Sequence, residues 1–504
     1  MSRNLNAEPQ LDTHAIQGDI LPGLLKKDEA LLFFTIDDVT TFRPFLHALP
    51  FTSMAEALEQ RAEVTRRKQA GVETLLPVPG LNVAFTFAGL TKLGVAGMDT
   101  PAELAAFRAG MAGRTDVLAD PPGTDWSVLG PGQPVDGVFV LTGASRAEID
   151  DTIALHLAPV GTNGWTLVHE EAGTVRPDPV HGHEHFGYAD GVSQPGVRGR
   201  TPDGQAVTPS VDPAGHPDQG SLGQDLLWPG EFVFGYLGQN PAGPTFRTKG
   251  AKSTPPVPVM RNGSFLVFRR LVQHVPEFDL AVKSLAATAT TADNPVTPEL
   301  MGAQLVGRWK SGAPLVMSPL HDDPALAEGT GAENDFEFDK DRDGTRCPYA
   351  AHVRKAYPRD DTPFSTDLEP EQSVVDAAEA FTQTHRMMRR GIAFGPELSH
   401  QEALTGVSDP GQQRGLLFKC YVTSIADQFE FVQQRWADNA DFAQAGSGLD
   451  PIIGQSSDAT THFRGAAPVT LDPADRPDLS VSHFVSMQGG EYFFAPSTTA
   501  LTTL

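Results

Sequence analysis

Short apolar runs alternate with amphipathic segments through the first third of the chain, and their spacing predicts a sheet covered by helices. The runs typical of strands are residues 30–36, 82–87, 137–143 and 164–170. Helical character is found at 54–70, at 102–112 and in a stretch to residue 157 that opens with Ser145 and Glu148 in capping-box spacing. Without the short insert, the order is β-α-β-β-α-β, which is the order of an antiparallel ferredoxin-like unit.

The same order of elements returns in the second part of the chain. Strand patterns occupy 229–236, 264–271, 385–395, 415–424 and the final FVSMQGGEYFFAPS segment. Helical patterns occupy 297–309 and 425–438. We therefore expect an α+β fold with two ferredoxin-like halves, residues 1–180 and 181–504, each with an antiparallel sheet. Long loops are concentrated in the second half, which favours that half as the location of the functional site.

Composition narrows the class of protein. The chain has 504 residues, 40% of them hydrophobic, which is enough for a large folded core. No apolar run reaches the roughly 18 residues of a membrane span, and no export signal is visible, so we expect a cytoplasmic protein without a membrane anchor. The net charge of −25 argues against nucleic acid as a partner. Only two cysteines are present, which excludes a disulfide scaffold, and the oligomeric state is left open.

Two segments have the spacing of metal sites. DKDRDG (339–344) matches the start of a calcium loop, but the position of its closing glutamate is Ala350, which excludes that interpretation. HGHEH (181–185) puts three histidines at alternating positions, where a strand would place them on one face for a metal. No further cysteine or histidine cluster completes a closed site, so ordinary polar loop histidines are the simpler interpretation.

The segment HFGYADGVSQP (185–195) places Asp190 among small residues. Gly187 and Gly191 free the backbone on either side, so the carboxylate can be presented into a cavity. The alternative is a glycine-bounded turn with a solvated aspartate. Taken by itself, this motif favours the turn.

Two basic segments supply further candidates. In RCPYAAHVRKAYPR (346–359), His352 follows two alanines, small residues that would let a flat macrocycle approach, and imidazole is a common axial ligand of haem iron. Arg354 and Arg359 are cations placed to meet carboxylates, which in a haem are its propionates. In RMMRRG (386–391), Arg389 and Arg390 alternate faces if the segment is a strand, so that one of them points inward.

Together these stretches resemble the dye-decolorizing peroxidase family, in its longer fungal-like and actinobacterial branch. The resemblance covers most of the chain and is carried, in family order, by AIQGDILPGL (15–24), HFGYADGVSQP, PGEFVFGY (229–236), RNGSFLVFRRL (261–271), GTRCPYAAHVRKAYPR (344–359), MMRRGIAFG (387–395), LLFKCYVTSIADQFEFVQQRW (416–436) and GGEYFFAPS (489–497). Each segment is weak evidence by itself, and their combination is strong.

The resemblance implies a dimeric α+β barrel-like fold with one haem b per chain in the C-terminal half. It implies that His352 is the proximal iron ligand and that Asp190 and Arg389 form the distal pair. Arg389 is preferred over Arg390 because the family's arginine is the first of the two. The other cofactor-binding residues that it implies are Arg354, Arg359, Leu416 and Phe418, with Glu430 as the carboxylate that holds the ligand histidine.

The implied activity is the reduction of hydrogen peroxide with one-electron oxidation of dyes, phenols, other aromatic reductants or Mn²⁺. Trp309, Trp436, Tyr357 and Tyr421 are candidates for passing electrons, and simple packing is the alternative role for each. Two other functions stay open at this point. One is a haem-binding or iron-release protein on the same fold with little peroxidase turnover, and the other is a structural metal protein built on HGHEH.

Overall fold

Four strands of the N-terminal half form the first part of the sheet in a computed structural model of the chain. The structure describes residues 3–72, 76–159, 162–243, 248–292, 295–327, 332–362, 370–455, 460–464 and 478–504. The strands are β1 (Asp28–Ile36), β2 (Gly80–Phe85), β3 (Gly137–Gly143) and β4 (Trp165–Thr174), in the spatial order β4-β1-β3-β2. Helices α3 (Phe87–Lys92) and α6 (Arg146–Thr152) pack on this part.

The C-terminal half repeats this arrangement. Its strands are β9 (Ser264–Gln273), β10 (Met388–Arg389), β11 (Ile392–Phe394), β12 (Gly415–Val422) and β15 (Val485–Ala495). Both β10 and β11 pair with β12, and the spatial order is β10-β12-β9-β15. In each half the first strand therefore lies between two later ones, β1 between β3 and β4 and β9 between β12 and β15. The predicted α+β fold with two antiparallel ferredoxin-like halves is confirmed.

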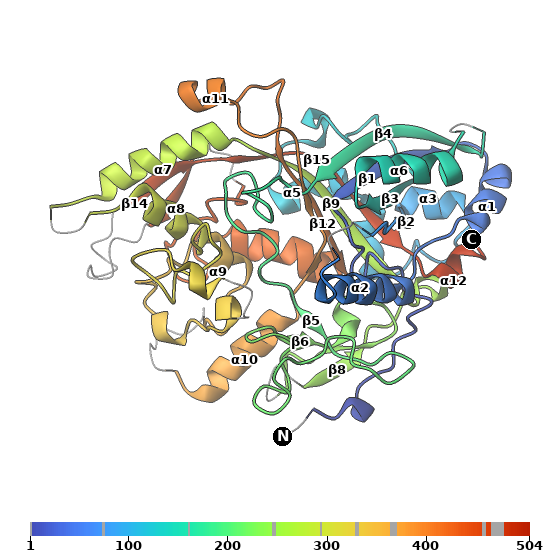
Figure 1. Cartoon of the computed structure of the whole chain (residues 1–504), viewed down its shortest axis with the longest axis horizontal. Helices are drawn as coiled ribbons and strands as arrows, with labels where there is room; N and C mark the ends of the chain where they lie inside the picture. The colour runs from blue at the N-terminus through green and yellow to red at the C-terminus, as the bar shows by residue number, and fades with distance from the viewer. Residues whose placement is uncertain are drawn as a thin grey trace.

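The two halves share one curved sheet. Strand β15 pairs with β2 through Phe494 and Phe85, which joins the halves into nine antiparallel strands. The outer strands β4 and β11 also approach each other. They are so close that a Cβ atom at Gly173 would collide with Ile392 Cγ2. The sheet is thus bent into a barrel-like form, and α7 (Val275–Ala289) and α8 (Pro298–Val306) lie on the opposite side of the molecule from α3 and α6 (Figure 1).

The remaining elements are mostly short. The helices are α1 (Val39–Ala48), α2 (Met54–Gln69), α4 (Ala105–Ala109), α5 (Thr115–Leu118), α9 (His352–Ala356), α10 (Gln372–Gln383), α11 (His400–Thr405), α12 (Thr498–Leu501) and a π-helical segment in two parts, Ile425–Glu430 and Val432–Ala437. The strands are β5 (Gly196–Val197), β6 (Leu226–Leu227), β7 (Leu237–Gln239), β8 (Lys249–Lys252), β13 (Thr460–Arg464) and β14 (Asp478–Ser482).

One predicted strand is absent. Residues 229–236 form a 3-10 turn (Pro229–Glu231) followed by bends, and a strand begins only at β7. The backbone N–H groups of Phe232 and Val233 both donate to Pro229 O, so the proline turns the chain back before it can extend. The apolar side chains of this segment are buried all the same, which explains why the hydrophobic pattern resembled a strand.

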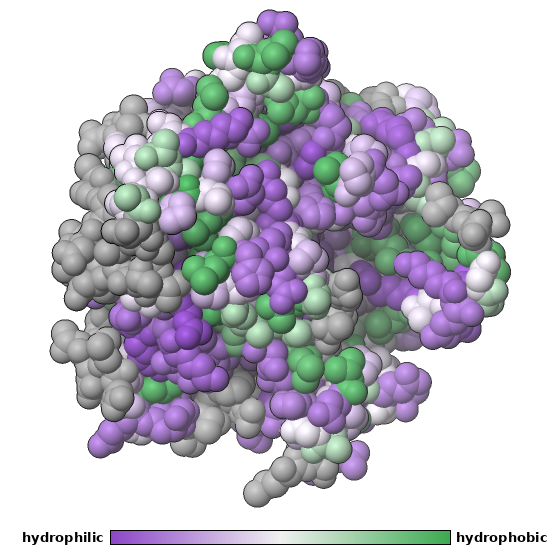
Figure 2. Space-filling model, turned by 60° about the vertical axis from the view of Figure 1, so that its left-hand side comes forward, coloured by the Kyte–Doolittle hydropathy of each residue, from purple (hydrophilic) through white to green (hydrophobic). Residues whose placement is uncertain are grey.

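The face drawn in Figure 2 is mostly hydrophilic, with scattered hydrophobic side chains and a group of them in a hollow at the right. Among the described residues, no helix is long and apolar enough to cross a membrane.

A buried charge network fastens the N-terminal segment to both halves of the sheet. Lys419 Nζ on β12 donates to Asp19 Oδ2 (2.9 Å) and to Glu29 Oε1 on β1 (2.6 Å). The Tyr421 hydroxyl also donates to Asp19 Oδ2 (2.8 Å). Burial by itself would raise the pKa of Asp19, but the neighbouring Lys419 and Lys26 outweigh it and lower the pKa to about 2.

The low pKa of Asp19 predicts that its contribution to stability depends on pH. The contribution is complete above the unfolded pKa of 3.8 and is lost as pH falls through about 2. The difference between the unfolded and the folded pKa corresponds to roughly 2 kcal/mol of unfolding free energy. We expect Asp19→Asn to lower the free energy of unfolding most above pH 4, with a difference that shrinks towards pH 2. Denaturant unfolding of both proteins across this range measures it, with the exposed Asp116→Asn as control. A difference that is constant or grows on acidification contradicts the assignment.

Candidate active site

A large cavity opens in the C-terminal half. It is enclosed by the loop 184–195, by β9, by α9 and by the helical segment 425–437. Its empty space, open mouth included, is about 1820 Å³. The part of this space that the centre of a water-sized sphere can occupy is about 280 Å³, close to the lower end of the roughly 300–1,000 Å³ of typical small-molecule sites, so the cavity has the size of a ligand site.

Glu184 organises the loop that carries Asp190. Its carboxylate accepts hydrogen bonds from the backbone N–H groups of Phe186 and Tyr188 (2.8 Å each) and from Gln273 Nε2. Burial raises the pKa of Glu184, against these hydrogen bonds. Gly187 and Gly191 both have positive φ (+91° and +72°), the backbone freedom that the sequence suggested. The loop thereby places Asp190 on the cavity wall.

Arg389 reaches the same wall from the end of β10. Its Nη1 lies 3.8 Å from Asp190 Oδ1, and its Nη2 donates to Ser193 O (2.7 Å). Gln194 fixes the backbone of Arg389, accepting from its N–H and donating to its carbonyl. Arg390 points elsewhere, donating to the carbonyls of Asp19 and Ile20. The structure therefore brings Asp190 and Arg389 together and keeps Arg390 out of the cavity.

His352, the first residue of α9, is fixed by a buried carboxylate. Its Nδ1 shares a hydrogen bond with Asp450 Oδ2 (2.8 Å), while Asp450 Oδ1 accepts from the N–H groups of Ile452 and Ile453. Burial opposes protonation of His352, but the pKa is raised because Asp450 outweighs burial. With Nδ1 occupied as a donor, Nε2 is the nitrogen available to the cavity that His352 lines.

Three further residues predicted from the sequence also line the cavity. Leu416 and Phe418 lie on one face of β12, with the fully buried Leu417 on the other. Arg359 Nη1 donates to the carbonyls of Phe336 (2.7 Å) and Asn334 (3.3 Å), but its buried Nε has no hydrogen-bond partner among the described residues. An orphaned guanidinium donor on a cavity wall is the feature that an anionic ligand would satisfy.

Comparison with known proteins identifies the family. The family model described as the DyP dimeric alpha+beta barrel domain matches residues 15–177. Dye-decolorizing peroxidase msp1 of Mycetinis scorodonius is 34% identical over 97% of this chain and 86% of its own length. The chain belongs to the dye-decolorizing peroxidase family. A solved mutant of the Pleurotus ostreatus dye-decolorizing peroxidase matches this peroxidase with a TM-score of 0.79 and 33% identity, over 98% of this chain and 99% of that one.

The family assignment makes this protein an oxidoreductase of the peroxidase class. The multifunctional dye peroxidase of Amycolatopsis sp. is also similar over nearly the whole chain, at 31% identity, 97% of this chain and 95% of the relative. The haem-binding alternative without turnover is not favoured, because deferrochelatases match only 28% of the chain. Dye-decolorizing peroxidases are haem enzymes, and the cavity, His352 Nε2 and the orphaned Arg359 Nε fit that cofactor.

The prediction that Glu430 holds the ligand histidine is wrong. Glu430 accepts two hydrogen bonds from Arg114 (2.8 and 2.6 Å) and one from the Tyr492 hydroxyl (3.1 Å). Glu430 is not among the residues that line the cavity, and Asp450 occupies the predicted role instead. Asp450 follows the irregular segment GSGL, where no periodicity or motif singled it out.

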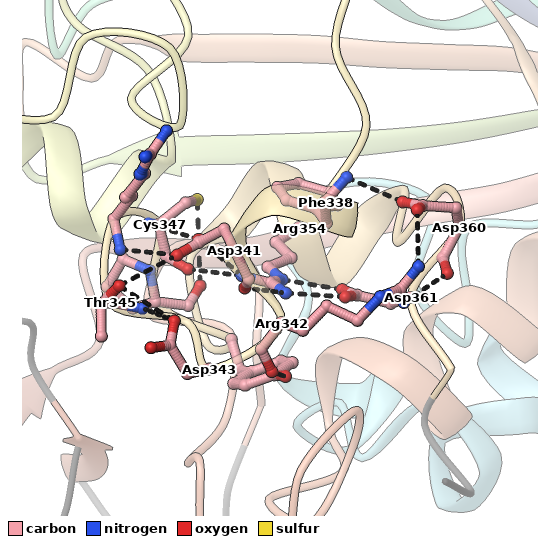
Figure 3. A network of polar contacts seen from close by, with 12 residues as sticks. Phe338, Asp341, Arg342, Asp343, Thr345, Cys347, Arg354, Asp360 and Asp361 are labelled. Atoms are coloured by element: carbon pink, nitrogen blue, oxygen red, sulfur yellow. Dashed lines mark hydrogen bonds and ion pairs between the residues drawn. The ribbon is translucent and has the colours of Figure 1, made fainter. Parts of the chain in front are cut away.

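The prediction that Arg354 meets a haem carboxylate is also wrong. Arg354 is fully buried and all five of its N–H donors are used within the protein, by Asp341, Asp361 and the carbonyl of Cys347 (Figure 3). Tyr349 and Phe338 cover its guanidinium. The segment DKDRDG thus supplies Asp341 as an anchor for this arginine. No donor is left for a ligand.

The three histidines of HGHEH do not converge. His181 is exposed, whereas His185 is buried with its Nε2 against Phe394 O (2.9 Å). Burial lowers the pKa of His185 to about 4, so this ring is neutral at physiological pH. Within the described parts of the chain, no group of three histidine, cysteine or acidic side chains could hold a metal ion.

The Glu184 contacts predict a local effect of removing this side chain. Glu184→Ala leaves two buried backbone N–H groups without acceptors, which we expect to cost about 1–3 kcal/mol of unfolding free energy. The amide hydrogens of Phe186 and Tyr188 should then exchange faster, as measured by hydrogen exchange with mass spectrometry. Glu59→Ala, at an exposed position of α2, is the control. Unchanged exchange at residues 184–190 would show that Glu184 does not hold the loop.

Proposed function

We propose that this peroxidase holds one haem b in the cavity of residues 181–504, with His352 Nε2 as the iron ligand. The observation that carries the proposal is that one cavity contains both an imidazole fixed by a buried carboxylate and a carboxylate–guanidinium pair. Arg359 Nε is the donor assigned to a propionate, and Leu416 and Phe418 supply apolar contact. When bound, the haem supplies an iron that takes up peroxide and oxidising equivalents that are passed to reductants.

Asp190 is the general acid–base in this proposal. Cleavage of the O–O bond requires a proton to leave one peroxide oxygen and to reach the other. Oδ1 of Asp190 already accepts from Gly191 N–H (2.6 Å), so we assign the proton transfer to Oδ2. Arg389 adds a fixed positive charge for the negative charge that develops on oxygen, and its bond to Ser193 O holds it in place.

Asp450 positions His352, the proposed iron ligand. Its hydrogen bond fixes the orientation and tautomer of the imidazole, and it makes Nε2 a stronger electron donor. The two backbone N–H groups on Oδ1 keep the carboxylate in one position although it is fully buried.

Hydrogen peroxide is the oxidant and aromatic compounds are the reductants that we propose. A solved relative is a complex of dye-decolorizing peroxidase with 2,6-dimethoxyphenol, at 32% identity over 98% of this chain, which supports phenols and dyes as the reductant class. The net charge of −25 would attract Mn²⁺, which we keep as a second reductant to be compared in the same assay.

Removing either distal residue should slow the reaction with peroxide. We expect Asp190→Asn and Arg389→Leu each to lower the rate of peroxide reduction at least about 100-fold while haem content is kept. Stopped-flow absorbance of the haem-loaded proteins measures this, and Arg435→Leu, at an exposed position of the same charge, is the control. If both variants react as fast as the unmodified protein, the distal assignment fails.

A further inference from the structure

Tyr357 lies on the cavity wall at the end of the segment that begins with His352. Its hydroxyl donates to Asp225 Oδ2 and accepts from Gln383 Nε2 (3.0 Å). Asp225 is buried at the start of β6, and Gln383 is buried at the end of α10. A phenol that faces a redox cofactor site and is hydrogen-bonded to a carboxylate has a proton acceptor already in contact.

The other tyrosines do not combine these features. The chain has six, and all of them fall within the described residues. Tyr421 and Tyr492 donate to carboxylates (Asp19 and Glu430) but do not line the cavity. Tyr236 donates to Asn262 and Tyr349 to a backbone carbonyl. Tyr188 lines the cavity but has no carboxylate as hydrogen-bond acceptor among the described residues. Position and hydrogen bonding therefore single out Tyr357.

Two arginines determine how Tyr357 can lose an electron. The guanidinium of Arg386 lies 3.6 Å and that of Arg359 lies 4.9 Å from the centre of its ring. Because both are cations, they disfavour a positively charged ring, so an electron can leave only together with the phenolic proton. Burial also raises the pKa of Tyr357 well above its usual range, against the pull of Arg386, so no phenolate exists beforehand.

Asp225 is suited to take that proton. Arg386 Nη1 lies 3.3 Å from Asp225 Oδ2, the same oxygen that accepts the Tyr357 hydroxyl. The proton has to move only along an existing hydrogen bond. Gln383 Nε2 stays as a donor to the phenolic oxygen after the proton has left.

We propose that Tyr357 is a redox-active residue of this peroxidase, an inference that rests on the function proposed above. Tyr357 passes one electron to the cofactor that peroxide has oxidised, while its O–H bond breaks and the proton goes to Asp225 Oδ2. The product is a neutral tyrosyl radical and a protonated Asp225. An aromatic reductant then returns one electron, and Asp225 returns the proton, which restores both residues. Tyr357 thus gives reductants a second point of electron delivery, on the protein wall.

The test is freeze-quench electron paramagnetic resonance of the haem-loaded protein after one equivalent of peroxide. We expect a tyrosyl radical in the unmodified protein and in Tyr492→Phe, which removes a buried, carboxylate-bonded tyrosine outside the cavity. The signal should be lost in Tyr357→Phe and in Asp225→Asn. An undiminished radical in Tyr357→Phe overturns the proposal, and one in Asp225→Asn overturns Asp225 as the proton acceptor.

A second measurement needs no variant. A nitroso spin trap added with peroxide to the unmodified protein, followed by peptide mass mapping, should place the adduct on Tyr357. An adduct elsewhere, or none, overturns the proposal. The haem absorption spectrum recorded in the same samples separates failure of the Tyr357 inference from failure of the peroxidase proposal. A protein that binds haem and reacts with peroxide but forms no radical at Tyr357 refutes only this inference, whereas one that does not react refutes the peroxidase proposal as well.

Discussion

The hydrogen bond between His352 and Asp450 is the interaction on which the active site depends. It joins the start of α9 to a loop that lies 98 residues further along the chain, and it selects which imidazole nitrogen faces the cavity. A fully buried carboxylate is unfavourable unless its oxygens are satisfied. Here one oxygen receives the imidazole N–H and the other receives two backbone N–H groups, so that the acid and the ring hold each other in place.

Whether an arginine can bind a ligand in the site depends on how many of its N–H donors are already hydrogen-bonded within the protein. Arg354 and Arg359 are five residues apart and both buried, yet the first has all its donors paired, while the second lines the cavity and has a buried Nε without a partner in the described parts of the chain. Arg389 and Arg390 are adjacent and diverge in the same way, one towards Asp190 and the other towards the N-terminal segment. Charge alone therefore does not identify a ligand-binding arginine, and the partners of each donor must be known.

The sequence was most informative where a continuous apolar run becomes a central strand. The predicted run 137–143 has the same bounds as β3, which is buried along its whole length. Helix α1 escaped prediction because it contains Pro44 and several β-branched residues, so that packing of Phe42 and Leu46 must support it. Helix α7 could have been found, since Phe278, Val282 and Leu285 follow helical spacing on its buried face.

The site was only partly predictable, because some of its residues lie in local motifs and others depend on contacts between distant parts of the chain. The segments of Asp190, His352 and Arg389 carry local motifs, and the fold brings all three to one cavity. Asp450 and Asp225 lie in irregular loops without such motifs, and their roles depend on contacts between distant parts of the chain. Glu430 lies in a predicted amphipathic helix and was therefore easier to select from the sequence than Asp450. The direction of a side chain on a helix, however, depends on packing that a single sequence does not specify.

Resonance Raman spectroscopy of the ferrous, haem-loaded protein tests the central claim most directly, because the iron–histidine stretching band reports both the ligand and its hydrogen bond. We predict a band in the unmodified protein that shifts to lower frequency in Asp450→Asn, where the imidazole becomes a weaker donor, and that disappears in His352→Ala. A band that is unchanged in Asp450→Asn, or one that persists in His352→Ala, would contradict the assignment of His352 and Asp450.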